Sequence, residues 1–213
     1  MLYFVKTPQL LKRLFSNMIW DIPSSEKVIY LTFDDGPTNK VTEWVLSELD
    51  KYNAKATFFC IGKNIQNNQD LFQKILRKKH AVGNHTYNHL NNWKVSKKTY
   101  LEDTKKCQKT LNDLTLEKKT KLFRPPYGKI SLQIAKKLSE KEHKIIMWDV
   151  LSGDFDQSIT KEKCTENVLK NTTSGSIVVF HDSVKASDNL YYCLPKTLAH
   201  FTKLGYVFKS IDT

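Results

Sequence analysis

Two histidines stand four residues apart in the segment His85-Thr86-Tyr87-Asn88-His89. This spacing predicts two imidazoles on one side of a helical turn, which suits two ligands of one metal ion. The preceding Gly83 and Asn84 and the polar surroundings favour a site built on a loop over a histidine pair in the core. Surface histidines can meet the same spacing by chance, so a metal site requires further converging ligands.

Asp34 and Asp35 supply carboxylates directly after the apolar, β-branched run from Val28 to Phe33, which is typical of a buried strand. Adjacent side chains in an extended segment point to opposite sides, so one carboxylate can ligate a metal while the other acts as a base. The segment Asp34-Asp35-Gly36-Pro37 is also good turn sequence, which is the structural alternative. Two histidines and one carboxylate would complete a three-ligand hydrolytic site of the zinc type, with an open position for water.

Further polar groups follow other apolar runs. Arg124, one of only three arginines, begins the rigid loop Arg124-Pro125-Pro126-Tyr127-Gly128, whose alternative interpretation is a structural turn with a surface arginine. His181 and Asp182 follow the buried-strand run from Ile177 to Phe180, where they could instead cap a helix. Asp154 lies in the loop beyond another apolar run.

The elements that must position these groups alternate between apolar strand-like runs and amphipathic helical stretches. We expect strands at 28–33, 56–61, 144–150, 177–180 and 206–209, and helices at 41–49, 71–79, 93–114, 132–138, 161–170 and 193–204. This alternation indicates parallel β/α units with a covered sheet. In a β/α barrel the loops at the carboxyl ends of the strands share one face, so we expect the polar groups to form one active site there.

The first 25 residues predict a helical extension. Thr7 would cap the helix with Pro8 at its first position, and one apolar stripe would follow, made of Leu10, Leu11, Leu14, Phe15 and Met18. We expect this stripe to pack on the domain, with a membrane-surface helix as the alternative. The features of a signal peptide are missing, which predicts a cytoplasmic location, and no linker or repeat divides residues 1–213, which predicts a single domain.

The composition is that of an ordinary globular chain of 213 residues, 40% hydrophobic and 26% charged. No stretch approaches the roughly 18 consecutive apolar residues of a membrane span. The 34 basic and 22 acidic residues give a net charge of +12, which suggests an anionic partner. Only three of the basic residues are arginines, the side chain best suited to planar phosphate recognition, so we expect no nucleic-acid reader. The four cysteines contain no C-x-x-C pair and are expected to be reduced.

Taken in order, these motifs resemble those of the polysaccharide deacetylases (carbohydrate esterase family 4, the NodB-homology domain). The segments that carry the resemblance are Thr32 to Pro37, Ala56 to Phe59, His85 to His89, Arg124 to Tyr127, Trp148 to Phe155 and Val179 to His181. The resemblance implies a distorted, shortened (β/α) barrel of the TIM type with about seven strands. It also implies a divalent metal, zinc or cobalt, and removal of N-acetyl or O-acetyl groups from a carbohydrate such as peptidoglycan or a chitin-type oligosaccharide.

The resemblance also implies a role for each matching residue. Asp35, His85 and His89 would be the metal ligands. Asp34 would be the general base, paired with Arg124, and His181 would be the general acid, oriented by Asp154. The backbone N–H of Tyr127 would hold the oxyanion. Tyr127, Trp148 and Phe155 would be walls of the acetyl pocket, although Trp148 fits a buried core position equally well.

The fourth motif departs from the common family pattern Asp-x-x-Asp-Trp, because Leu151 stands at the first aspartate and Phe155 at the tryptophan. This difference bears on substrate choice and on the tuning of His181. Three other functions stay open: a metal-dependent esterase or amidase for a non-polymeric acyl substrate, a non-catalytic glycan-binding relative, and a basic protein that binds polyanions.

Overall fold

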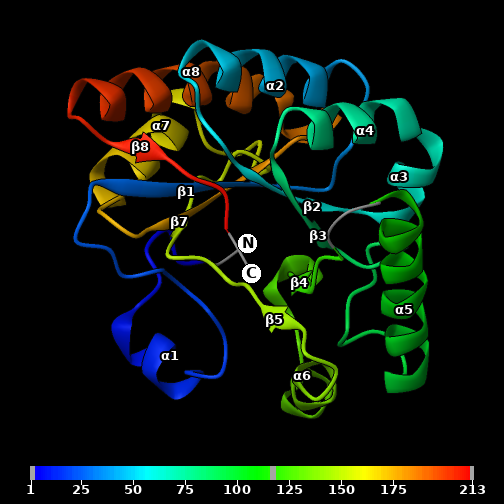
Figure 1. The fold of residues 1–213 in the computed structure, drawn as a ribbon. Coiled ribbons are helices and arrows are strands. Elements are labelled where there is room, and N and C mark those ends of the chain that lie inside the picture. The colour runs from blue at the N-terminus through cyan, green and yellow to red at the C-terminus, as the bar shows by residue number, and fades with distance from the viewer. Residues whose placement is uncertain (1–2, 116–118, 212–213) are drawn as a thin grey trace.

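The computed structural model describes residues 3–115 and 119–211, and in these ranges the strands form one parallel sheet wrapped by helices (Figure 1). Seven strands follow the order β5-β4-β3-β2-β1-β7-β6, and an eighth, β8, pairs with the beginning of β1. Their bounds are β1 (Val28–Asp34), β2 (Thr57–Cys60), β3 (Ala81–Asn84), β4 (Leu122–Phe123), β5 (Lys144–Ile145), β6 (Val150–Leu151), β7 (Ile177–His181) and β8 (Val207–Phe208). This arrangement is the predicted distorted (β/α) barrel.

The helices lie around the outside of the sheet, and each of them except α1 has residues buried against the rest of the molecule. They are α1 (Gln9–Leu14), α2 (Val41–Lys51), α3 (Gly62–Asn67), α4 (Gln69–Arg77), α5 (Lys97–Leu114), α6 (Leu132–Ser139), α7 (Lys161–Asn171) and α8 (Ser187–Lys203). Short 3₁₀ turns cover Pro126–Gly128 and Val184–Ala186. None of the helices described is long and apolar enough to cross a bilayer.

The centre of the core lies on β1, whose residues are buried on both faces. Phe33 stacks between Phe58 of β2 and Phe180 of β7, with ring centroids 5.1 and 5.9 Å apart, because the parallel register sets these three residues side by side. A strand covered on both faces requires a near-continuous apolar run, which is what residues 28–33 provide. All four cysteines are buried and free, as expected.

The N-terminal segment differs from the predicted helical extension. The helix covers only Gln9–Leu14, and Leu10 and Leu14 are exposed, so the predicted stripe is wrong at these two positions. Thr7 does not cap the helix, because its hydroxyl donates to the backbone carbonyl of Trp148 at 2.7 Å. This segment is therefore positioned by contacts with residues further along the chain and not by a long helix.

The same segment explains why the predicted strand at 144–150 is two strands. Ile19 forms a parallel bridge with Ile146, and Lys6 forms an antiparallel bridge with Val150. The side chains of Lys6 and Lys12 both pair with Asp149, each at 2.6 Å. Residues 146–149 therefore pair with the N-terminal segment between β5 and β6, which lie at opposite ends of the strand order.

Other elements begin or end at different residues from those predicted. β3, β4 and α3 were not predicted, since they are short and β3 contains Gly83 and Asn84, which disfavour strands. The helix predicted from Trp93 begins at Lys97, after Ser96, whose side chain caps it by accepting from the N–H of Thr99. The last long helix begins at Ser187 rather than at the predicted residue 193.

Candidate active site

Asp35, His85 and His89 lie together at the carboxyl ends of β1 and β3. Nε2 of His89 is 3.3 Å and Nε2 of His85 is 3.8 Å from the same oxygen, Oδ1 of Asp35. Within the described residues, these three side chains form the one group of its kind that could hold a metal ion. Oδ1 of Asp35 is buried and has no hydrogen-bond partner there, which is costly for a carboxylate oxygen. A cation at this point would satisfy it, so the residues present fit a metal.

The segment from His85 to His89 is a loop and not the predicted helical turn. Thr86 and His89 have left-handed backbone conformations, with φ of 62° and 56°. The reason is Asp103 of α5, whose carboxylate accepts the N–H groups of Tyr87 and Asn88 at 2.7 and 2.9 Å. A side chain thus takes the donors that helical carbonyls would otherwise have taken.

The electrostatic surroundings keep both imidazoles neutral. Burial lowers the pKa of His85, and it lowers the pKa of His89 to about 4. Nδ1 of His85 lies 2.8 Å from the backbone carbonyl of Arg124, which acts as an acceptor for the Nδ1–H tautomer. That tautomer leaves the Nε2 lone pair directed toward Asp35, the arrangement that a metal-binding histidine needs.

Asp34 occupies the opposite side of the same strand end and pairs with Arg124, whose side chain is fully buried. The guanidinium Nη1 donates to Asp34 Oδ1 at 2.8 Å and to the hydroxyl of Thr32 at 2.6 Å, and Nη2 donates to the carbonyl of Met147 at 2.8 Å. Burial, the largest influence, acts to raise the pKa of Asp34, but Arg124 together with His85 and His181 outweighs it and the pKa is lowered. Asp34 is therefore an ionised carboxylate in a buried setting.

His181 and Asp154 form a second pair beside Asp34. The register of β1 and β7 places His181 next to Asp34. Nδ1 of His181 lies 2.7 Å from one oxygen of Asp154, and its backbone N–H donates to the other oxygen at 2.7 Å. Burial acts to lower the pKa of His181, but Asp154 outweighs it and raises the pKa to about 9. The imidazole is thus a cationic proton donor near neutral pH.

Comparison with known proteins agrees with this geometry. The sequence model of the polysaccharide deacetylases matches residues 21–146, more than half of the chain. The chain is 35% identical over 194 residues to a peptidoglycan-N-acetylglucosamine deacetylase of Bacillus cereus, an alignment that covers 91% of this chain and 90% of that protein. The chain belongs to the polysaccharide deacetylase family.

Other polysaccharide deacetylases extend the comparison to structure. The crystal structure of the Bc1960 peptidoglycan N-acetylglucosamine deacetylase, in complex with an N-oxidanyl-benzamide, matches with a TM-score of 0.87 and 30% identity, covering 96% of this chain and 95% of that one. The peptidoglycan-N-acetylmuramic acid deacetylase PdaC of Bacillus subtilis is 30% identical over 78% of this chain and 34% of its own length. The predicted family, fold and enzyme class, a carbohydrate deacetylase, are confirmed.

The three aromatic residues predicted as pocket walls of this deacetylase differ in surroundings. Tyr127 is exposed, has a left-handed φ of 60°, and packs its ring 4.6 Å from that of His89. Phe155 is half-buried and meets His181 edge to face at 5.1 Å. Trp148 is half-buried, packs on the core and lies under Gly128, where an added Cβ would be 2.5 Å from the indole. Trp148 thus supports the Tyr127 loop from below, in line with its core interpretation.

Sequence reasoning placed Asp182 among the polar groups of the active site but gave it no role there. Asp182 is fully buried and accepts the N–H of Gly36 at 2.9 Å and the hydroxyl of Thr42, so it fixes the loop after Asp35 and caps no helix. A Cβ at Gly36 would lie 2.0 Å from Oδ2 of Asp182, which explains the glycine. The adjacency of Asp182 to His181 was the only signal in the sequence.

Tyr3 and Asp103 were missed. Tyr3 packs 5.4 Å from Phe155 and donates its hydroxyl to Asp156 at 3.0 Å, so the N-terminal segment supports the turn after Asp154. Asp103 reads in the sequence as an ordinary polar residue of a helix. Neither carries a local signal, because each acts through a contact with a distant part of the chain.

Proposed function

We propose that this chain is a metal-dependent hydrolase that removes N-acetyl groups from N-acetylglucosamine-containing glycans of the peptidoglycan type. The observation that carries the proposal is the buried oxygen of Asp35, which accepts no hydrogen bond and faces two neutral imidazoles. The ionised carboxylate of Asp34 and the protonated imidazole of His181 lie beside this group. The names of the relatives, which are peptidoglycan deacetylases, support the substrate class.

Asp35, His85 and His89 would hold the metal, with zinc as the leading candidate and cobalt as the alternative, since imidazole and carboxylate ligands suit such ions. A bound divalent ion would polarise the acetyl carbonyl and lower the pKa of water, so that a carboxylate of low pKa suffices as proton acceptor.

The residues of the chain then divide the proton transfers. Asp34, held ionised and oriented by Arg124, accepts a proton from the attacking water. The backbone N–H of Tyr127 donates to the carbonyl oxygen as charge develops on it. An amine anion is a very poor leaving group, so His181 donates the proton on its Nε2 to the departing nitrogen while Asp154 holds the imidazole through Nδ1.

The test is acetate release from N-acetylglucosamine oligomers and peptidoglycan fragments by metal-stripped protein, with and without added zinc or cobalt. We expect release only with metal. Stoichiometric metal binding without release from any member of the panel would indicate a different acyl substrate. If the protein neither binds metal nor releases acetate, the proposal is overturned and a non-catalytic glycan-binding protein is favoured.

A further inference from the structure

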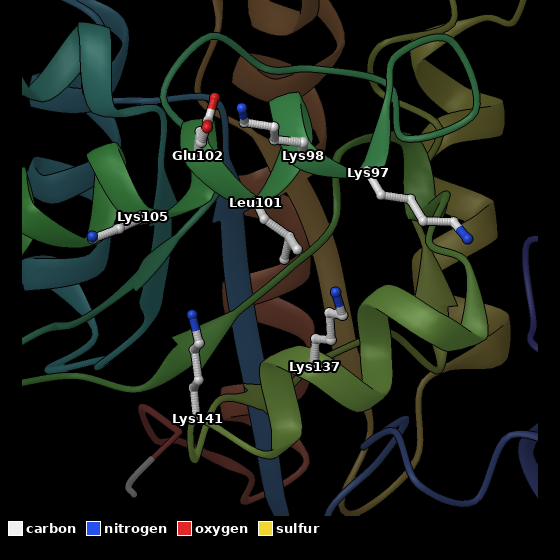
Figure 2. Close-up of a pocket in the computed structure, with 7 residues that line it drawn as sticks. All are labelled: Lys97, Lys98, Leu101, Glu102, Lys105, Lys137 and Lys141. Carbon is white, nitrogen blue, oxygen red and sulfur yellow. The ribbon is translucent and has the colours of Figure 1, made fainter.

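A hollow of about 430 Å³ lies between α5 and α6 and is ringed by lysines (Figure 2). It is lined by Lys97, Lys98, Leu101, Glu102, Lys105, Lys137 and Lys141. Figure 2 shows Lys137 of α6 and Lys141 of the turn after α6 reaching toward α5, with Leu101 directed into the space between the helices. Five ammonium groups and one carboxylate therefore surround a single surface hollow, which we call the lysine groove.

The lysines of the groove are not matched by acidic partners. Among the described residues, no ion pair or hydrogen bond involves the side chain of Lys98, Lys105, Lys137 or Lys141. Elsewhere on the surface lysines do pair: Lys109 lies 2.6 Å from Asp113, for example. Because like charges in one place repel each other, the groove gains stability when an anion enters it.

The groove leads to the catalytic edge of the sheet. α5 follows the loop that carries His85 and His89, and α6 follows the loop from Arg124 to Gly128. The first turns of the two helices meet, since the Lys97 ammonium donates to the side chain of Gln133. Helices that connect parallel strands begin at the carboxyl edge of the sheet, so this end of the groove lies at the same edge as the active site.

A further lysine lies near the loops of the site. The ammonium of Lys129 lies 4.9 Å from the ring centroid of Trp93, an indole that is 69% exposed. Trp93 is four residues beyond His89, and Lys129 is two residues beyond Tyr127. Lys129 thus adds one cationic side chain to the loop that follows Tyr127, between the site and α6.

We propose that the lysine groove binds the carboxylates of a peptide-bearing glycan strand while a neighbouring sugar of the same strand lies in the active site. The proposal rests on the proposed function, since the groove opens at the catalytic edge and a polymer that enters it is then the substrate itself. It also accounts for part of the net charge of +12, which the catalytic residues leave unexplained. Exposed ion pairs are weak and screened by salt, so the groove contributes affinity and not chemistry.

The test compares two triple variants of equal net charge. The first, Lys98→Gln/Lys137→Gln/Lys141→Gln, removes charges from the groove. The matched control, Lys109→Gln/Lys163→Gln/Lys170→Gln, removes exposed lysines that already pair with Asp113 or Glu166. The dissociation constants of full-length chains are measured, in chelator so that no turnover occurs, for soluble peptidoglycan strands and for the same strands stripped of peptides.

We expect the groove variant to bind peptide-bearing strands on the order of tenfold more weakly at low salt, with the difference lost at high salt. The control should bind like the wild type, and peptide-free strands should not distinguish the three proteins. An equal loss in both variants, or an equal loss on peptide-free strands, would overturn the proposal. Groove-dependent binding of a phosphodiester polymer instead of the peptide-bearing strand would also overturn it.

A parallel assay separates this proposal from the proposed function. With metal added, the groove variant should raise KM on peptide-bearing strands and leave kcat on a neutral N-acetylglucosamine oligomer unchanged. If no protein releases acetate from any substrate, the proposed function fails while the binding result still stands. If all three proteins release acetate with the same KM, the proposed function stands and the lysine groove has no role in it.

Discussion

The substitution Asp154→Asn tests what sets the pKa of His181, the proposed general acid. Asp154 is fully buried and holds His181 through two contacts of 2.7 Å, one to Nδ1 and one from the backbone N–H. Asparagine keeps the shape but has one acceptor oxygen, so it can accept from Nδ1–H or from the backbone N–H of His181 but not from both. What the variant removes is the negative charge that keeps His181 protonated.

The size of the effect follows from the pKa of His181. Burial, the largest influence, acts to lower this pKa, and Asp154 is the main group that raises it to about 9, with weaker help from Asp35 and Asp34. Without the charge of Asp154, the pKa should fall toward 6.5 or below. At pH 8, a pKa of 6.5 would reduce the protonated fraction from about nine-tenths to about 3%, a loss of about 30-fold in rate, and a lower pKa would increase the loss.

The assay is the pH dependence of acetate release between pH 5 and 10. In the wild type the alkaline limb should lie near pH 9, and in Asp154→Asn it should move toward pH 6.5 or below, with activity recovered as the pH falls. Asp156→Asn is the matched control, because that neighbouring carboxylate bonds Tyr3 and Ser158 instead of His181. An unchanged alkaline limb, or a loss of the same size at every pH, would refute the reasoning.

The free energy of unfolding should also depend on pH through His181. Because the folded-state pKa of His181 is raised above its usual value of 6.5, the pair with Asp154 contributes stability that is fully present below about pH 6.5 and is lost as the pH rises through about 9. Denaturant unfolding should therefore show that the free energy of unfolding of the wild type decreases from pH 7 to pH 10, and that the decrease is smaller in Asp154→Asn. An equal decrease in the two proteins would contradict the conclusion that Asp154 keeps His181 protonated.

Four further substitutions address the rest of the site. His85→Ala or His89→Ala should abolish stoichiometric zinc binding in elemental analysis, and full metal content in either variant would remove that residue from the ligand set. Asp34→Asn should retain metal yet release acetate about 10²–10⁴ times more slowly, and turnover at the wild-type rate would exclude it as the base. Gly36→Ala should lower the free energy of unfolding by about 1–3 kcal/mol, because its Cβ would collide with Asp182, and an unchanged denaturation midpoint would show that the loop can move aside.

Much of the active site could be predicted because the types and the spacing of its residues indicate a metal-binding, hydrolytic site. Asp34 ends the strongest apolar run, and Asp35 follows it outside the strand with a left-handed φ of 84°. The prediction of separate directions assumed an extended segment, which the structure shows for Asp34 only. The structure gives them separate partners, Arg124 for Asp34 and the two histidines for Asp35. The separate partners agree with the predicted separation of roles, and the roles themselves stay predictions.

Element boundaries were less predictable where pairing with distant segments decides them. Residues 144–150 read as one apolar strand, yet their middle pairs with the N-terminal segment through Ile19. β4 has only two residues, and its place in the sheet comes from its neighbours β3 and β5. No local propensity predicts such elements, because their hydrogen bonds come from other strands.

The sequence by itself determined which donors, acceptors and possible metal ligands the active site contains, and that they follow successive strands, since residue type and order along the chain are covalent facts. Only the tertiary structure decided which of them meet. Asp182 reaches the backbone of Gly36 across 146 residues, and Asp103 turns a predicted helical segment into the loop that aims His89. Such contacts depend on how helices and strands pack, and packing sums weak interactions over the whole chain, which no local pattern records.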